Sequence, residues 1–174
     1  MPSLDHIEEQ KASLLRSISH WTEERLHFRP RGGEWCAIEV LDHLVRTEAA
    51  VLEAASTGVA TPRRIGLSDR VRTAFLVRLF RSQTRVKAPG NVTQILPATG
   101  LRLMEITGRW DLVRKDLRLF LEKNPAEQLQ KGIFRHPIGG WMNASGILTF
   151  FSVHIIHHGF QLHRLASASR ESVR

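Results

Sequence analysis

The sequence contains, at residues 144–167, the stretch ASGILTFFSVHIIHHGFQLHRLAS. Its apolar side chains recur at the three- and four-residue spacing of a helix with one buried face. His154 and His158 fall on that face, together with Ile147, Phe151, Leu162 and Leu165. Asn143 can cap the first turn of this helix. The stretch therefore predicts a long final helix that turns two histidines toward the interior.

The same periodicity predicts three more long helices before this one. They are expected at residues 3–27, 37–57 and 100–123, separated by Pro and Gly breaks. A loop is expected at residues 137–140, and strand patterns are scarce because no Tyr and no sustained alternation are present. We therefore predict an all-α fold in a single domain over residues 1–174. Its expected form is an up-and-down four-helix bundle with a long helix 2–helix 3 connection containing a short basic helix.

The overall composition is that of an ordinary globular protein, with 42% hydrophobic and 24% charged residues. Residues 1–10 are polar and acidic, so no signal peptide is expected. No run approaches the roughly 18 to 20 apolar residues that a membrane span requires. The one cysteine, Cys36, excludes an internal disulfide and fits a reducing compartment. We therefore expect a cytoplasmic protein without a membrane span.

The formal net charge of +8 is concentrated in one segment, residues 61–90, which alone carries +7. A short helix is expected inside it at residues 68–82, with Val71, Phe75, Leu79 and Phe80 as its apolar residues. Such a segment could engage nucleic acid or an anionic membrane. However, no recognition motif is present, and a run of charges is most often a solvated face. We expect no specific nucleic-acid partner and keep a non-catalytic basic bundle, binding nucleic acid or an anionic surface, as an alternative.

The two histidines of the last helix are candidates for metal ligands. His154 and His158 are four residues apart, so one turn stacks them with Cβ atoms about 6 Å apart. Two imidazoles at this spacing can reach a common zinc-like ion, although satisfied or partly exposed histidines also show it. A third ligand is required, and His43 is the best candidate, at the edge of an apolar stripe in the second helix. His157 and His163 lie on other faces and are interpreted as ordinary polar residues.

Two other residues could contribute to such a site. Glu48 could face the interior, where it could ligate the metal, orient an imidazole or act as a general base. A carboxylate at the rim, paired with an arginine, explains Glu48 equally well. Cys36 would stand at the start of the second helix, about 10 Å along the axis from His43. We therefore interpret Cys36 as a small buried residue and not as a fourth ligand.

Several blocks of sequence carry a resemblance to a known family. They are Phe28-Arg-Pro30, Gly33-Glu-Trp35, Trp35-Cys-Ala-Ile-Glu-Val-Leu-Asp-His43-Leu ending in Glu48, Val86-Lys-Ala-Pro89, His136-Pro137 and His154-Ile-Ile-His157-His158-Gly-Phe-Gln161. In order and spacing, these blocks resemble the DinB-like superfamily of metal-binding four-helix-bundle proteins. The resemblance implies that His43, His154 and His158 bind a divalent metal ion.

The resemblance also suggests a chemistry. Three histidine ligands leave at least one coordination position open, which is typical of catalytic metal sites, and imidazole suits zinc and nickel. The thiol-dependent S-transferases of this superfamily imply a small-molecule substrate and a low-molecular-weight thiol. A metal-dependent hydrolase of amides or esters is the alternative, and Glu48 is the candidate catalytic residue. We therefore expect an enzyme that depends on zinc or nickel.

The last helix also carries apolar residues on a second face. Val153, Ile156 and Phe160 lie nearly opposite the metal-facing side. Each could gain about 1.5 to 3 kcal/mol on full burial. A homodimer through this face is expected, since relatives in the superfamily often pair. Coverage by the basic segment between the second and third helices is the alternative.

Overall fold

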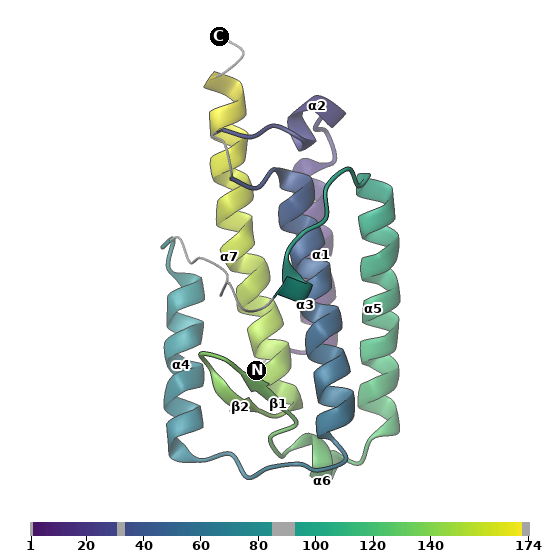
Figure 1. Cartoon of the computed structure of the whole chain (residues 1–174), viewed down its shortest axis with the longest axis vertical. Helices are drawn as coiled ribbons and strands as arrows, with labels where there is room; N and C mark the ends of the chain where they lie inside the picture. The colour runs from purple at the N-terminus through teal and green to yellow at the C-terminus, as the bar shows by residue number, and fades with distance from the viewer. Residues whose placement is uncertain (1, 31–33, 85–92, 172–174) are drawn as a thin grey trace.

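The computed structural model describes residues 2–30, 34–84 and 93–171. This part of the chain is mostly helical, as predicted, with one small two-stranded sheet in addition. The long helices are α1 (Leu4–Ile18), α3 (Ala37–Gly58), α4 (Leu67–Arg81), α5 (Leu103–Lys123) and α7 (Ala144–Glu171). Helix α3 packs on α5 and α7, and α7 also packs on α1 and α4 (Figure 1). The helices α3 and α7 thus lie at the centre, while α4 and α5 stand on opposite sides.

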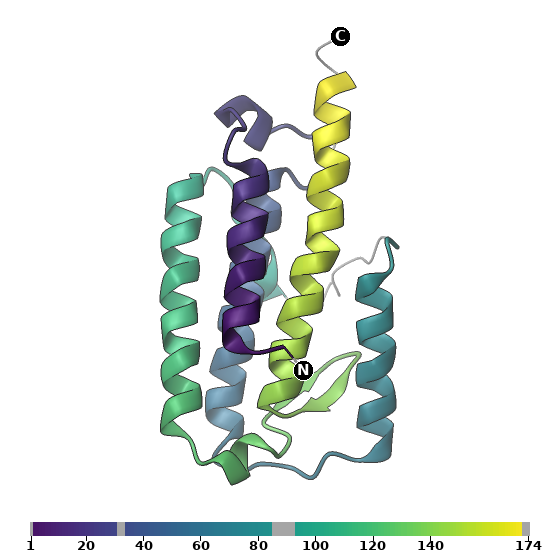
Figure 2. The same ribbon diagram turned by 180° about the vertical axis from the view of Figure 1, so that it is seen from behind.

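After α3 and before α5 in the sequence, the chain runs back along α4. In Figure 1, α3 descends to the lower end of the molecule, α4 ascends from there, and α5 descends again. Figure 2 shows the same arrangement from behind, with α4 at the edge beside α7. The short basic helix expected at residues 68–82 is therefore present as α4, and it is an outer helix.

The first predicted helix is two helices in the structure, α1 and the short α2 (Glu23–Leu26). At the end of α1, the Ser19 hydroxyl donates a hydrogen bond to the Arg16 carbonyl, competing with the helical pattern. Thr22 then begins α2, because its side chain accepts from the backbone N–H of Arg25. Trp21 between them is buried, so the apolar spacing continues across the break. This continuity is why periodicity predicted a single helix.

The loop expected before α7 contains a hairpin of β1 (Phe134–His136) and β2 (Gly140–Met142). The strands are antiparallel, with Arg135 opposite Trp141. Asp69 of α4 accepts a hydrogen bond from the backbone N–H of Trp141, at 3.0 Å, and so ties the hairpin to α4. Gly140 has φ +73°, and a Cβ there would lie 2.6 Å from the Asp69 carboxylate. This turn therefore requires glycine.

Helix α3 is deeply buried along its first turns, since every residue from Ala37 to Val45 is buried. The polar ones among them have partners: the Asp42 carboxylate accepts from Arg46, Arg109 and the backbone N–H of Ala98. Buried polar groups need such partners, because an unpaired one would be costly. His43 belongs to this buried stretch, so its position between the other helices is firmly set.

The second apolar face of α7 is partly covered within the chain. Val153 is fully buried in a cluster that includes Leu76 and Phe80 of α4. Ile156 and Phe160 are half-buried. The basic segment therefore covers the first of the three residues, as the alternative interpretation expected, and leaves the other two partly accessible.

Among residues 2–30, 34–84 and 93–171, no helix has both the length and the apolar character that crossing a bilayer requires.

Candidate metal centre

Three histidines from two central helices converge in the interior. His154 and His158 lie one turn apart on α7, and His43 faces them from α3. The Nε2 atom of His154 is 3.0 Å from Nε2 of His158 and 3.3 Å from Nε2 of His43. One ligand atom from each residue can be chosen so that all three lie within 4.8 Å of one another. The structure thus brings together the three residues that the sequence predicted.

The orientation of two of these rings is fixed by hydrogen bonds at their other nitrogen. His43 Nδ1 lies 2.7 Å from the carbonyl oxygen of Ile95, in the short helix η1 (Thr93–Ile95). His158 Nδ1 lies 2.8 Å from Oε1 of Gln161. Both oxygens are acceptors, so each Nδ1 carries the proton and donates. The neutral rings therefore leave their Nε2 lone pairs free, which is the arrangement that metal-binding histidines usually show.

The third ring, His154, is held by aromatic neighbours. It stacks on Phe150 at a centroid distance of 5.2 Å and on Phe80 at 5.4 Å. Its Nδ1 has no hydrogen-bond partner among the described residues. Since neither His43 nor His158 has a proton on Nε2, His154 can satisfy at most one of them by donation. Three buried nitrogens that face one another are short of protons, and a cation would satisfy all three.

The electrostatic environment keeps these histidines neutral. Burial lowers the pKa of His43, while the hydrogen bond to Ile95 opposes the shift. Burial also lowers the pKa of His154 and His158 well below the usual value, and the neighbouring histidines lower both further. Two nitrogens on one zinc-like ion, each at about 2.0–2.1 Å, lie about 2.9–3.4 Å apart at angles from a right angle to tetrahedral. The separations of His154 Nε2 from Nε2 of His158 and of His43, 3.0 and 3.3 Å, both lie in this range.

A sequence model of the DinB superfamily matches residues 6–162 of the chain. The chain belongs to the DinB superfamily. The match includes all three converging histidines and every helix from α1 to most of α7. No curated protein and no solved structure matches the chain significantly.

Glu48 lies outside the group formed by His43, His154 and His158, which we call the histidine group. Its carboxylate is completely buried and accepts from Trp110 Nε1 at 2.8 Å and from Arg114 Nη2 at 2.7 Å. Burial raises the pKa of Glu48, and the Arg114 charge and both hydrogen bonds oppose that shift. Glu48 is therefore paired with an arginine, as the second interpretation expected, but deep in the interior and not at a rim.

His157 has more contact with the three converging histidines than the sequence indicated. It is buried, its ring stacks on Phe80 at 5.0 Å, and it meets the ring of His158 edge-on at 5.1 Å. Its burial comes from α4, which packs against this side of α7. The adjacent pair His157-His158 was the available signal, but its meaning depends on which helix covers α7.

His136 also lies near the centre, on the hairpin. Its Nδ1 accepts from the backbone N–H groups of Ile138 and Gly139, and its ring contacts Phe150 at 4.7 Å. Burial, reinforced by the Arg72 charge, lowers the pKa of His136 to about 4. The sequence offered no partner for His136, because its contacts depend on the hairpin.

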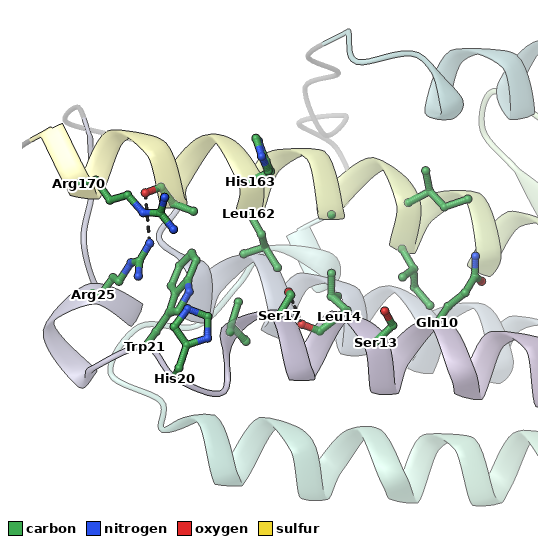
Figure 3. A pocket seen from close by; sticks show the side chains of 15 residues that line it. Gln10, Ser13, Leu14, Ser17, His20, Trp21, Arg25, Leu162, His163 and Arg170 are labelled. Atoms are coloured by element: carbon green, nitrogen blue, oxygen red, sulfur yellow. Dashed lines mark hydrogen bonds between the residues drawn. The ribbon is translucent and has the colours of Figure 1, made fainter.

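Other candidate residues lie away from the histidine group. A groove of about 480 Å³ lies between α1 and α7, and Figure 3 shows His20 and His163 among the side chains that line it. None of its lining residues is one of the three converging histidines. Cys36 is buried at the start of α3, and burial is the main cause that raises the pKa of its thiol. The interpretation of Cys36 as a small buried residue is therefore supported.

Proposed function

We propose that this DinB-superfamily chain is a metal-dependent enzyme in which His43, His154 and His158 hold one divalent ion, zinc or nickel. We infer that α1, α3, α5 and α7 act as the four-helix bundle that supports this ion, within a single domain over residues 1–174. The observation that carries the proposal is the convergence of three buried Nε2 atoms, at least two of which lack a proton. Imidazole nitrogens suit either metal.

The donor set favours catalysis over a purely structural site. Three protein ligands leave a coordination position for a further group, whereas structural zinc sites use four. When bound, such an ion lowers the pKa of a thiol or water at that position. The residues of the chain hold the imidazoles neutral and oriented, through Ile95 and Gln161, and the rings of Phe80 and Phe150 shield one of them from water.

We favour transfer from a low-molecular-weight thiol, which the family resemblance implies. The thiol sulfur forms a bond to an electrophilic carbon of the second substrate. The leaving group departs from that carbon with its electron pair, and the thiol proton passes to solvent. No carboxylate belongs to the histidine group in the described residues, and Glu48 is occupied by Arg114 and Trp110. Hydrolysis of an amide or ester remains the alternative, and it would gain most from a nearby base.

An activity comparison distinguishes the two reactions. The chain, loaded with zinc or nickel, is assayed with a panel of low-molecular-weight thiols and a chromogenic aryl halide, and separately with a chromogenic ester. We expect thiol transfer that falls by about 100-fold or more in His158→Gln. The matched control is His163→Gln, five residues further along α7 in the groove of Figure 3, which should keep the activity. Metal-dependent ester cleavage without thiol transfer would support the hydrolase instead.

We further propose a homodimer that uses the accessible part of α7. Ile156 and Phe160 are half-buried in the single chain, and Ile156 lines the groove between α1 and α7. Sedimentation equilibrium should show a dimer that Phe160→Glu dissociates while metal content is kept. A wild-type monomer at tens of micromolar would contradict the proposal. The single cysteine, Cys36, being buried, is compatible with the cytoplasmic location that we also propose.

A further inference from the structure

Helix α4 presents an unusual face to the outside. Leu67, Val71 and Phe75 are spaced four residues apart, so they form one stripe along the helix. Their exposed fractions are 78%, 62% and 57%. The inward side of the same helix is formed by Leu76 and Phe80, which are buried. Figures 1 and 2 show α4 at the edge of the molecule, on the side away from α5. The exposed fractions of the three side chains show that the stripe faces solvent.

Positive charges border this stripe. Arg70, Arg78 and Arg81 are exposed, and none of the ion pairs found in residues 2–30, 34–84 and 93–171 includes them. Asp69, the one acidic residue of α4, is turned toward the backbone N–H groups of Gly66 and Trp141. The outward face of α4 is therefore apolar along its middle and basic at its margins.

A basic groove adjoins this face. It lies between α4, the start of α7 and the hairpin, and its volume is about 1210 Å³. Its lining includes the cationic side chains Arg63, Arg64, Arg70, Arg81 and Lys131. No Asp or Glu is among the described residues that line it. The groove therefore continues the basic margin of the stripe and suits the phosphate groups of an anionic ligand.

The combination of features distinguishes between possible occupants. A second copy docked face to face would bring the arginines of both α4 helices together, which like charges oppose. Nucleic acid would meet the arginines but would leave the apolar stripe against a charged backbone. An anionic bilayer accommodates both, because apolar side chains enter the boundary of headgroups and acyl chains while arginines contact lipid phosphates. At about 1.5 Å per residue, the 15 residues of α4 give a helix of about 22 Å.

We propose that α4 is a membrane-surface helix that docks this enzyme on anionic lipid. Leu67, Val71 and Phe75 enter the interface, and the bordering arginines bind lipid phosphates there. The helix α5 provides the contrast, because its exposed Met104 and Leu112 lie among charges of both signs, including Glu105, Asp111 and Lys115. Exposed apolar residues alone therefore do not make such a face, whereas the stripe of α4 is bordered by arginines and the one acidic residue of α4 is turned toward backbone N–H groups.

The test is co-sedimentation of the full chain with lipid vesicles. Binding is expected to vesicles that combine phosphatidylglycerol with phosphatidylcholine, and not to phosphatidylcholine alone, and it should weaken as salt is raised. Leu67→Ser/Phe75→Ser and Arg70→Gln/Arg78→Gln should each weaken it by about tenfold or more. Met104→Ser/Leu112→Ser is the matched control and should bind like wild type. All six positions are exposed, and circular dichroism verifies the fold.

Several results would overturn the proposal. They are equal binding to neutral and anionic vesicles, absence of binding to anionic vesicles, and an equal loss of vesicle binding in Met104→Ser/Leu112→Ser. Full displacement by inorganic phosphate would identify a free-phosphate site in the groove. Duplex DNA binding that survives Leu67→Ser/Phe75→Ser would indicate nucleic acid, and a change of oligomeric state in that variant without loss of vesicle binding would indicate a second copy.

Fluorescence gives an independent readout. A polarity-sensitive dye on Phe75→Cys should shift to the blue with anionic vesicles, whereas the same dye on Leu112→Cys should not. Cys36 is buried, so labelling is directed to the introduced thiol. An equal shift at both positions, or none at Phe75→Cys, contradicts docking through α4.

Discussion

Replacing Arg114 by methionine should destabilise the protein strongly, because it leaves the Glu48 carboxylate buried without its counter-charge. The side chains of Glu48 and Arg114 are only 1% and 4% exposed, and their closest atoms are 2.7 Å apart. Removing one partner of such a pair costs about 3–5 kcal/mol. Unfolding entropy of about 2.1 cal/mol/K per residue, over the 174 residues, converts this to a fall in Tm of about 8–14 °C. Calorimetry or thermal circular dichroism measures it.

A second substitution tests the cause. Glu48→Gln in the Arg114→Met background removes the buried charge, keeps an acceptor for Trp110, and should restore much of the loss. Burial already raises the pKa of Glu48, and removing Arg114 raises it further. The folded form then binds a proton more readily than the unfolded form, so stability of the single variant should rise as pH falls toward the ordinary carboxyl range.

The matched control for this experiment lies on the same helix. Arg118 pairs with Asp5 at 3.5 Å, but the two side chains are 52% and 82% exposed. Arg118→Met should therefore change stability by less than about 1 kcal/mol. The reasoning is refuted if Arg114→Met costs no more than Arg118→Met, or if Glu48→Gln restores nothing.

Three further predictions concern single positions. Gly58→Ala should destabilise the protein by about 1–3 kcal/mol, because its Cβ would lie 1.8 Å from the carbonyl oxygen of Ile133. The Cβ of Gly108→Ala in α5 would meet no such atom within 4 Å, so this substitution should stabilise the protein by about 0.5–1 kcal/mol. Chemical denaturation compares the two variants. In metal-free protein, the stability of wild type should fall more steeply than that of His136→Asn as pH falls from about 6.5 to about 4. The cause is the depressed pKa of His136, because of which the unfolded form binds the proton first. The difference in stability, on the order of 3 kcal/mol, is measured by denaturation at each pH. Cys36 should react with a thiol reagent only on unfolding, because burial raises its pKa, and rapid reaction of the folded protein would contradict this.

Two residues of the candidate metal centre were predictable because they follow the periodic pattern of a helix. His154 and His158 share the apolar face of a long helix, and helical geometry alone places them side by side. His43 required more, since helical spacing says nothing about which residue of another helix lies opposite. Its place at the edge of an apolar stripe made His43 the best candidate, and the resemblance to the DinB-like superfamily implied the same residue. The structure brings the three Nε2 atoms together.

Features set by tertiary contacts were not predictable from spacing. The pattern of α4 marked Val71 and Phe75 as apolar but could not show that they face outward. The burial of His157 depends on the packing of α4 against α7. Glu48 illustrates the same limit, because its partners Trp110 and Arg114 come from a helix about 60 residues later in the chain. The hairpin strands, at three residues each, are too short for alternation to reveal.

Metal content tests the central claim most directly. After purification, exposure to excess zinc or nickel and dialysis, the protein should retain about one ion per chain, as measured by elemental analysis. The double variant His154→Ala/His158→Ala should retain none, while His20→Ala/His163→Ala, which alters two histidines of the groove in Figure 3, should retain the wild-type amount. Equal metal in wild type and in His154→Ala/His158→Ala would contradict the account.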